Sequence, residues 1–521
     1  MNSQSANSYD VVIMGGALAG SATAILLLRR NPKLRVLIVE KSDKFSRRVG
    51  EATVEVSTFF LQRCLGLTHH LHQNHLVKNG LRFWFANERT QEVPDCSEIG
   101  GKYLSRVGAY LVDRAVLDQA ALDRATDLGA ELWRPAMVTR FDLEEGGQQR
   151  LTVARGEDSL EVSARWIVDA SGVAALIARK QGWLRAHESH PTAAAWARWR
   201  GCVNWDDPKF LDKYPKWSKR CFGLRGTATN HMMGDGWWAW WIPLRGDEIS
   251  IGLVFDQRFV DWGGGGTVAE RLKNFLLKHP VGGELLKDAE CVEGDVHFRR
   301  NLAYTCDTVA GDGFALVGDA SGFMDPFYSP GLDWLAFTTY GAAQLILDER
   351  AGRSAAHGAA TLNQNLRKSY RLWFDAIYLN KYEYLGEYDL MRIAVQLDIA
   401  NYYMGVAIQP YFRGEVAFTE PCFSQKGALP FQWWISVYNR RLAAIARSRR
   451  RRGKLGRTND GRRLLLGGFA FNAGTVWLLI RGTLSWIALE ISEGWRTWFA
   501  ATAEEKAPTR AREKEAAVGE T

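Results

Sequence analysis

The stretch from Tyr9 to Glu40 constrains the fold of this chain more than any other part of it. It begins with YDVVIM (Tyr9–Met14), a continuous apolar run typical of a strand buried inside a parallel sheet. GGALAG (Gly15–Gly20) follows, and the Ala- and Leu-rich segment after it predicts a helix that ends near Arg30. RVLIVE (Arg35–Glu40) predicts a second strand. Strand, Gly-rich turn, helix and strand in this order predict a dinucleotide-binding α/β unit.

The residues of this unit have separable tasks in binding a dinucleotide. Gly15 would make the tight turn, and Gly20 would let the helix pack closely against the sheet. The helix N-terminus would then face a pyrophosphate, and Glu40 would accept a ribose hydroxyl. Ala17 stands where the GxGxxG fingerprint has its middle glycine, so a Gly-rich turn in an unrelated α/β protein is the alternative. The candidate cofactor contacts here are Gly15, Gly16, Ala17, Ala19, Gly20 and Glu40.

Three further motifs favour FAD over NAD. FALVGDASGFMDPF (Phe314–Phe327) is another apolar strand that ends in Gly-Asp, where Asp319 can hydrogen-bond the ribityl chain of a flavin. DRAVLD places Arg114 at a helix start, and IVDASG (Ile167–Gly172) predicts a third strand that ends in a turn. The order of these motifs resembles the FAD-binding monooxygenase and halogenase superfamily over residues 9–345.

GWWAWWIPL (Gly236–Leu244) places four tryptophans within five residues. Standing alone, the run would predict an aromatic-rich core strand. Within the superfamily it resembles WxWxIP, the signature of the flavin-dependent halogenases. The resemblance implies that Trp238 and Trp240 lie beside the flavin and keep an organic substrate away from it, so that the oxidant meets a halide ion.

HLVKNGLRFWF (His75–Phe85) is similar to the segment that carries the functional lysine of these halogenases. The resemblance implies that Lys78 receives hypohalous acid and directs the halogen to one carbon, as a hydrogen-bonding ammonium or as a haloamine. Apolar neighbours would lower the pKa of Lys78, because desolvation opposes its charge. A solvated surface lysine is the alternative.

Two more segments resemble parts of the family. RVGEAT (Arg48–Thr53) resembles a loop beside the flavin, which makes Glu51 a cofactor contact. DPFYSPGLD (Asp325–Asp333) resembles the segment that runs past the flavin and holds halide through backbone amides, which Ser329 and Gly331 would supply because Pro330 has no N–H. The resemblance also makes Gly331 a cofactor contact. Tyr328 stands where the tryptophan halogenases carry a glutamate, so the chain is more similar to the phenol- and pyrrole-type branch.

The predicted fold class is α/β, with a GR2/PHBH-like Rossmann-type FAD-binding core, an inserted β-sheet and a largely helical C-terminal region. We expect the core at residues 1–350, with the inserted sheet at about 180–300. The Tyr- and Trp-rich residues 351–500 would form helices that complete a substrate cavity, and residues 501–521 would be a disordered tail.

The predicted function is FADH2- and O2-dependent halogenation, with chloride or bromide, of an electron-rich aromatic that is free or bound to a carrier protein. The resemblance implies a separate flavin reductase as partner. The alternatives are an aromatic hydroxylase, a membrane-associated flavoprotein reductase of prenyl or polyene lipids, and a non-catalytic flavin-binding scaffold.

Charge and composition bear on partners and location. The net charge of +8 is concentrated in RSRRRRGK (Arg447–Lys454), which predicts a solvated segment able to meet anionic lipid or an acidic carrier protein. No nucleic-acid motif accompanies it.

The apolar run Leu464–Ile480 predicts a buried or interfacial helix, which leaves peripheral membrane contact open. Scattered cysteines predict reduced thiols in the cytoplasm. No metal site is predicted: the histidines of THHLHQNH (Thr68–His75) are expected on a wet helix surface.

Overall fold

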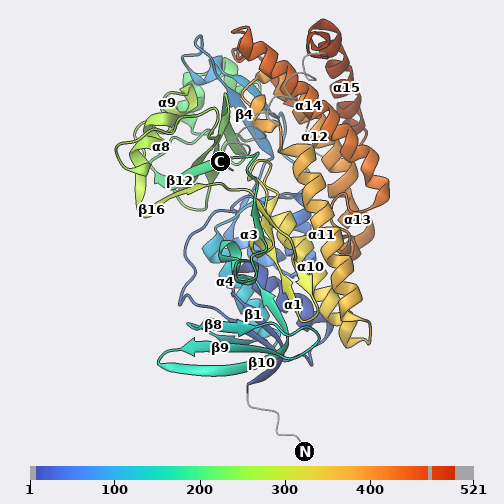
Figure 1. Ribbon diagram of the computed structural model, residues 1–521. Coiled ribbons are helices and arrows are strands. Elements are labelled where there is room, and N and C mark those ends of the chain that lie inside the picture. The colour runs from blue at the N-terminus through green and yellow to red at the C-terminus, as the bar shows by residue number, and fades with distance from the viewer. Residues whose placement is uncertain (1–6, 468–471, 499–521) are drawn as a thin grey trace, which may run out of the picture.

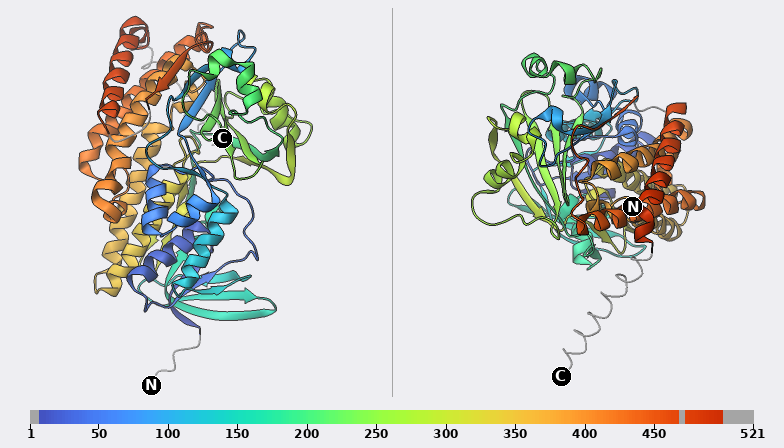
Figure 2. Two further views of the ribbon diagram at one scale, coloured as in Figure 1. Left: turned by 180° about the vertical axis from the view of Figure 1, so that it is seen from behind. Right: turned by 90° about the horizontal axis from the view of Figure 1, so that it is seen from above.

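The structure is a computed structural model that describes residues 7–467 and 472–498. Figure 1 shows three parts: a sheet with α1, α4 and α10 at the lower end, a second sheet with α8 and α9 at the upper end, and a column of helices along one side. Figure 2 shows from behind that this helical layer, α11 to α15, flanks both sheets. The tail predicted for residues 501–521 lies outside the described residues.

The first sheet has five parallel strands in the order β19-β10-β1-β2-β7 at its centre. Its apolar strands are buried on both faces because helices cover them, as a parallel sheet requires. The predicted first strand, helix and second strand are confirmed as β1 (Ser8–Met14), α1 (Leu18–Arg30) and β2 (Val36–Val39). The other elements are β7 (Glu131–Trp133), β8 (Met137–Asp142), β9 (Gln149–Arg155), β10 (Asp158–Asp169), β18 (Ala310–Gly311), β19 (Phe314–Leu316), α4 (Arg114–Asp127) and α10 (Gly331–Arg350).

The second sheet has eight strands and draws on three distant parts of the chain. Its centre comes from the region where an inserted sheet is expected, but earlier and later strands extend it. The strands in order are β16 (Glu290–Arg300), β12 (Thr192–Arg200), β15 (Ile249–Asp256), β14 (Trp237–Pro243), β13 (Thr229–Gly234), β4 (Leu81–Phe85), β5 (Ser97–Gly101) and β21 (Arg463–Leu466). Its outer side carries α6 (Pro208–Lys213), α7 (Pro215–Ser218), α8 (Val268–Leu276) and α9 (Pro280–Leu285).

The tryptophan run is strand β14, and its side chains alternate between two environments because successive residues of a strand face opposite sides. Trp241 belongs to the apolar cluster on the outer side, where Trp84 and Trp205 also pack. Trp238 and Trp240 belong to the other cluster, toward the first sheet. The run is therefore core packing on one face and a candidate cavity wall on the other.

The helical layer is fastened to the sheets by buried polar groups and ion pairs. The arginine block predicted to be a solvated segment instead ends α14, and its guanidinium groups pair inside the chain. Arg449 pairs with Glu387 and Glu493, and Arg450 pairs with Glu383 and Asp235. The helices are α11 (Ala355–Ile377), α12 (Tyr388–Asn401), α13 (Ile408–Arg413), α14 (Leu429–Arg451) and α15 (Ala473–Ser492).

The apolar run Leu464–Ile480 is not one helix, so this prediction is wrong in part. Its beginning forms β21, which pairs with β5 and buries the side chains of Leu464 and Leu466. A helix, α15, starts only at Ala473, after the side chain of Asn472 caps it. Within the described residues α15 is the one helix long and apolar enough to cross a membrane, and only 11% of its most apolar window is buried.

Short helices and strands connect the larger elements, and one of them is the histidine-rich helix α3 (Thr68–Asn74). The predicted wet histidine helix is α3, but His75 at its C-terminal end is buried, and burial lowers its pKa to about 4. That part of the prediction is wrong because His75 turns inward against His70. The remaining elements are α2 (Glu55–Phe59), α3 (Thr68–Asn74), α5 (Leu176–Lys180), β3 (Leu76–Val77), β6 (Tyr110–Leu111), β11 (Leu184–Ala186), β17 (Tyr304–Cys306) and β20 (Gly322–Phe323).

Candidate functional site

A cavity of about 980 Å³ lies between the two sheets. It is bounded by the turns after the strands of the first sheet, by β12, β13, β14 and β16, and by the start of α10. This volume is at the upper end of the range for ligand sites and suits a ligand as large as a dinucleotide. The predicted site residues that line it are Gly15, Ala17, Ala19, Glu40, Glu51, Arg114, Trp238, Trp240, Asp319, Ser329 and Gly331.

The Gly-rich turn has the geometry that the dinucleotide prediction requires. Gly15 has a positive φ of 110°, and a Cβ there would lie 2.5 Å from the carbonyl oxygen of Ala170. A Cβ on Gly20 would lie 1.9 Å from the carbonyl oxygen of Gly15. The first turn of α1 has no side-chain cap, which leaves backbone N–H groups for an anionic ligand.

Glu40 is buried at the end of β2 and holds this turn together. One carboxylate oxygen accepts the N–H of Gly16 at 2.7 Å, and the other accepts the N–H of Ser42 at 2.8 Å. Each oxygen has a second lone pair, so the carboxylate can still accept a hydroxyl from the cavity. The residues present therefore fit the adenosine half of FAD.

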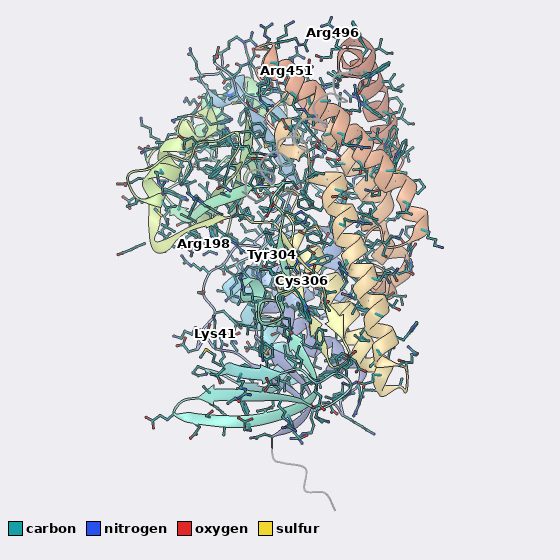
Figure 3. All side chains as sticks on the ribbon, viewed as in Figure 1. Lys41, Arg198, Tyr304, Cys306, Arg451 and Arg496 are labelled. Carbon is teal, nitrogen blue, oxygen red and sulfur yellow. The ribbon has the colours of Figure 1, made fainter. Side chains whose placement is uncertain are left out.

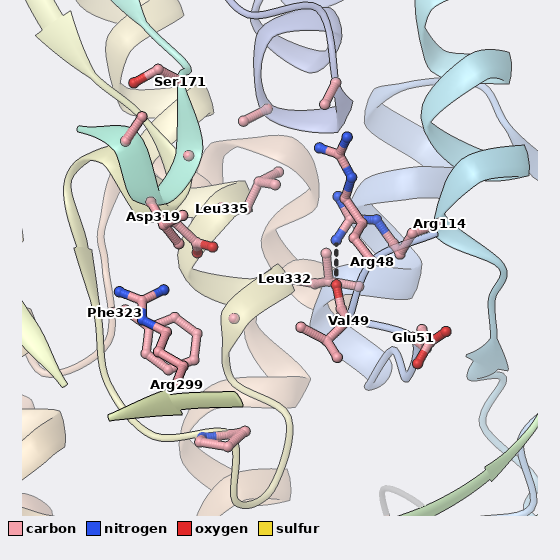
Figure 4. A pocket seen from close by; sticks show the side chains of 18 of the residues that line it. Arg48, Val49, Glu51, Arg114, Ser171, Arg299, Asp319, Phe323, Leu332 and Leu335 are labelled. Carbon is pink, nitrogen blue, oxygen red and sulfur yellow. Dashed lines mark hydrogen bonds between the residues drawn. The ribbon is translucent and has the colours of Figure 1, made fainter. Parts of the chain in front are cut away.

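Close to the Gly-rich turn, where a Cβ on Gly318 would lie 3.2 Å from the Cβ of Ala19, the cavity holds Asp319 among three arginines (Figure 4). Burial raises the pKa of Asp319, and the positive charges of Arg114, Arg299 and Arg48 oppose that rise. Arg114 is the first residue of α4 and donates to the backbone carbonyl of Val49 at 3.3 Å, the dashed contact in Figure 4. One acid and several cations converge here, which fits polar contacts to a phosphate-bearing flavin.

Glu51 faces the cavity from the RVGEAT loop and is fixed by Arg198 of β12, which Figure 3 labels. Burial raises the pKa of Glu51 to about 7, and the neighbouring Arg198 guanidinium counteracts this. Arg198 also pairs with Asp295 at 3.0 Å. The loop is thereby tied to the second sheet at the cavity wall.

The indole of Trp238 is locked by a chain of buried hydrogen bonds. Its Nε1–H donates to the hydroxyl of Tyr382 at 2.9 Å, and that hydroxyl donates to the carboxylate of Asp325 at 3.0 Å. His190 contacts the same carboxylate oxygen at 2.9 Å. Trp240 donates to Ser250 at 3.1 Å, and its ring lies over Gly252, where a Cβ would clash at 2.2 Å. Both indoles thus form a rigid wall.

Lys78 follows β3 and is 2% exposed. Its ammonium group donates to the backbone carbonyl of Thr53, in the RVGEAT loop, at 2.8 Å. It does not line the cavity, but it acts on His231, a buried cavity-lining residue whose ring stacks on Phe83. Burial lowers the pKa of His231 to about 3, and the charge of Lys78 adds to this lowering. Lys78 is therefore a buried cation close to the far side of the cavity wall.

Two carboxyl groups share the buried surroundings of Lys78. Burial lowers the pKa of Lys78 to about 8, while the charges of Glu55 and Asp333 act to raise it. Burial raises the pKa of Asp333 to about 8, and its oxygen accepts the N–H of Ser57 at 3.0 Å. Glu55 accepts a short hydrogen bond from Tyr403. This cluster can exchange a proton near neutral pH.

The segment predicted to hold halide has an unusual backbone. Tyr328 and Ser329 have positive φ values of 68° and 59°, which costs free energy for residues with a Cβ. The Ser329 N–H donates to the carbonyl of Pro326 at 3.0 Å, so it is already engaged. Gly331 is the first residue of α10, where backbone N–H groups lack partners within the helix. The halide role of both residues stays a prediction, and Gly331 has the stronger case.

The sequence motifs gave several residues at the site no role, although Arg48, Asp325 and Asp333 lie within two of the quoted segments. They are brought in by tertiary structure: Arg48 and Arg299 around Asp319, the carboxyl groups near Lys78, and the residues that anchor Trp238. Gly16 and Gly20 shape the turn without lining the cavity, and Lys78 lies beyond it. The individual roles of the predicted site residues remain predictions.

Comparison with known families identifies the first part of the chain. Residues 8–203 match the family described as FAD binding domain. This match includes the Gly-rich turn, Glu40, Glu51, Lys78 and Arg114. The prediction of FAD as the cofactor is confirmed.

Comparison with known proteins returns flavin-dependent halogenases. The chain is 26% identical over 369 residues to a flavin-dependent halogenase (chlA) of Dictyostelium discoideum, a match that covers 64% of this chain and 59% of that protein. It therefore spans about three fifths of that relative's length. It is 26% identical over 354 residues to the 1H-pyrrole-2-carbonyl-[peptidyl-carrier protein] chlorinase of Pseudomonas fluorescens, covering 63% and 73% of the two chains.

The crystal structure of halogenase PltM has the same fold. It superposes with a TM-score of 0.72 at 19% sequence identity and covers 92% of this chain and 97% of that chain. The predicted fold class, including the second sheet and the C-terminal helices, is confirmed. The resemblance to the flavin-dependent halogenases that the motifs indicated is likewise confirmed.

Proposed function

We propose that this chain, which resembles flavin-dependent halogenases, catalyses FADH2- and O2-dependent halogenation of an electron-rich aromatic compound with chloride or bromide. The observation that carries the proposal is the pairing of a rigid indole wall on the flavin cavity with a buried lysine near it. An ordinary flavin hydroxylase needs its substrate at the flavin and has no use for either feature.

The wall supports the proposal through what it excludes. Trp238 and Trp240 face the cavity with their indole N–H groups already engaged, so neither ring is free to swing aside. When bound, reduced FAD supplies, with dioxygen, the two-electron oxidation of the halide. An aromatic substrate held behind the wall can then receive only a small oxidised halogen species.

Lys78 is the proposed acceptor of that species. As an ammonium group, its Nζ can hydrogen-bond hypohalous acid. As a neutral amine, it can take the halogen to form a haloamine, while the O–halogen bond breaks and the hydroxyl group leaves as water with one amine proton. The lowered pKa of about 8 makes both forms accessible near neutral pH. In this scheme the carboxyl groups of Glu55 and Asp333 act by setting the charge of Lys78.

The proposed substrate is a phenol or a pyrrole. Tyr328, in place of a glutamate, supports this because an electron-rich ring needs less activation. The pyrrole chlorinase among the relatives acts on a ring bound to a carrier protein, so a carrier-bound substrate is included in the proposal. Docking of an acidic carrier to Arg447–Arg452 would compete with the ion pairs that Arg449 and Arg450 make inside the chain.

We further propose a cytoplasmic location and a separate flavin reductase that supplies reduced FAD. Seven free cysteines support a reducing compartment. The reductase is proposed from the resemblance, because flavin-dependent halogenases commonly receive reduced flavin from a separate enzyme.

The test needs no known substrate. Protein loaded with reduced FAD is mixed with oxygenated buffer with and without bromide, and protein-bound oxidising equivalents are titrated after free halide and peroxide are removed. The wild-type protein should hold an oxidant that depends on bromide. Lys78→Ala should lose it, whereas Lys216→Ala, which changes an exposed lysine of α7, should not.

Release of peroxide alone, equal with and without bromide, would overturn the proposal and favour the hydroxylase. A bromide-dependent bound oxidant that survives in Lys78→Ala would keep the halogenase and reject the role of Lys78.

A further inference from the structure

Helix α15 exposes one whole face of apolar side chains. The six large residues on it are between 44% and 73% exposed, and they recur at helical spacing along its full length. A monomeric protein rarely exposes a continuous apolar strip of this length without a partner. The α15 face consists of Val476, Trp477, Ile480, Leu484, Ile487 and Ile491.

The opposite face explains why α15 is held in this position. Gly482 packs against Leu397 of α12, where a Cβ would lie 2.9 Å from the leucine side chain. Trp486 packs edge-on against Trp434 of α14 with ring centroids 5.1 Å apart. Arg441 of α14 pairs with Glu490 at 2.7 Å. The helix is therefore a fixed part of the fold that keeps its apolar face turned outward.

Neighbouring helices extend the exposed apolar surface. Figures 1 and 2 place α13, α14 and α15 on the same side of the molecule, away from α8 and α9. Phe412 of α13 is 79% exposed, and Trp433 in the first turns of α14 is 62% exposed. Trp495 and Trp498, just after α15, are also exposed. Indole and phenyl rings of this kind are favoured where apolar tails meet polar headgroups.

The charges around the α15 face are positive. Arg481 is exposed in the middle of the helix, and its side chain makes no hydrogen bond or ion pair within residues 7–467 and 472–498. Arg496, which Figure 3 labels, is exposed just after the C-terminal end of α15. The carboxylates of Glu490 and Glu493 are neutralised by arginines of α14. Among the described residues, α15 therefore has no unpaired carboxylate, and the charged groups left beside its apolar face are cations.

We propose that the α15 face docks the protein on the surface of an anionic lipid bilayer, with α15 lying in the interface plane. Apolar side chains would enter the headgroup boundary while Arg481 and Arg496 meet lipid phosphates. A span across the bilayer is excluded by the packing of α15 on α12 and α14, which leaves only one face free. This inference does not depend on the halogenase activity.

A second copy of the chain is the less suitable occupant. Arg481 lies at the midpoint of α15, so a twofold pairing of two α15 faces would bring two unpaired guanidinium groups together. A bilayer with anionic headgroups has the opposite charge.

The test is co-sedimentation of the full-length FAD-loaded protein with two kinds of vesicle. One contains phosphatidylglycerol and phosphatidylcholine, and the other contains phosphatidylcholine alone. Binding should be stronger to the anionic vesicles and weaker at high salt. Ile480→Ser combined with Leu484→Ser should lower the partition coefficient at least about tenfold, because both side chains would lose burial in lipid. Arg481→Gln should lower it about fivefold on anionic vesicles only.

The matched control is Phe222→Ser, which removes a 66% exposed aromatic ring outside the helical layer and should leave binding unchanged. All substituted residues are exposed, so thermal unfolding should confirm intact folds. Absence of sedimentation with anionic vesicles, or equal binding by every variant, would overturn the proposal. A wild-type dimer that the Ile480/Leu484 variant makes monomeric, without vesicle binding, would assign the face to a second copy.

Discussion

Lys78 and Asp333 illustrate how burial shifts the pKa values of individual residues in this protein. Desolvation disfavours the charged form of each, so it moves the pKa of the amine down and that of the carboxyl group up until both lie near 8. Each group's charge counteracts the shift of the other. The result is a buried pair whose charge state changes within the range in which enzymes usually work.

Formation of the bound oxidant should therefore increase with pH. Because the pKa of Lys78 is lowered to about 8, the neutral amine becomes the main form between about pH 7 and 9. The carboxylate of Asp333 raises the pKa of Lys78, so Asp333→Asn should move the midpoint of the profile to lower pH. Titration of the bromide-dependent oxidant from pH 6 to 10, in about half-unit steps, gives the pH profile of the wild-type protein and of Asp333→Asn. A rate that falls through pH 8 would show that the ammonium form is the active one.

Glu40→Gln should weaken FAD binding about 10- to 100-fold. The carboxylate accepts two backbone N–H groups, and hydrogen bonds to a charged acceptor contribute about 1.5–3 kcal/mol. An amide can accept only through its single oxygen, so one N–H of the Gly-rich turn would face an NH2 group. Flavin fluorescence titration of the apoprotein gives the affinity. Glu88→Gln, at an exposed carboxylate, should bind FAD like the wild-type protein.

Single residues were predictable from the sequence where a local motif carries them. Glu40 and Gly15 belong to one contiguous strand-turn-helix-strand unit, and Lys78 precedes Gly80 in a segment that resembles a family motif. Glu55, His231 and Tyr382 were not predictable, because each reaches the site from a different element and only the folded chain brings them together.

At the level of elements, β14 performs two tasks because a strand alternates its side chains. Trp241 is 1% exposed among the tryptophans of the outer cluster, whereas Trp240 borders the cavity. The resemblance predicted that Trp238 and Trp240 face the cavity, and both line it, but it gave no place to Trp237 and Trp241. The predicted element boundaries were wrong for the apolar run Leu464–Ile480, which was expected to be one helix but begins as β21 and ends within α15.

Two alanine variants of β14 should separate these tasks. Trp241→Ala should destabilise the protein by about 3–5 kcal/mol through a core cavity, without changing the type of product. Trp240→Ala should cost less stability and should admit the substrate to the flavin, so that a hydroxylated product joins the halogenated one. Thermal unfolding and product analysis by mass spectrometry distinguish them. Identical products from both variants would contradict the role of the cavity-facing wall.

Over the whole molecule, the helical layer reaches into the site through buried polar groups. Tyr382 holds Asp325 at one end of the predicted halide segment. Within the segment, the hydroxyl of Tyr328 donates to Asp398 of α12 at 3.0 Å, and Lys381 contacts the same carboxylate at 2.8 Å. The general α/β core and the helical region were predictable from periodicity and motif order, whereas these long-range anchors depend on how the parts pack.

Removal of one anchor should test whether the layer positions the halide segment. Tyr328→Phe keeps the ring against Phe327 but frees the backbone, whose positive φ values at residues 328 and 329 are held by tertiary contacts. The KM for bromide should rise about tenfold, while FAD affinity stays unchanged and stability falls by about 1–3 kcal/mol. Tyr384→Phe removes a hydroxyl that contacts Lys381 in the same buried network without touching the segment. It should cost similar stability and leave the KM for bromide unchanged, so an equal rise in KM for both variants would show that the network acts only through stability.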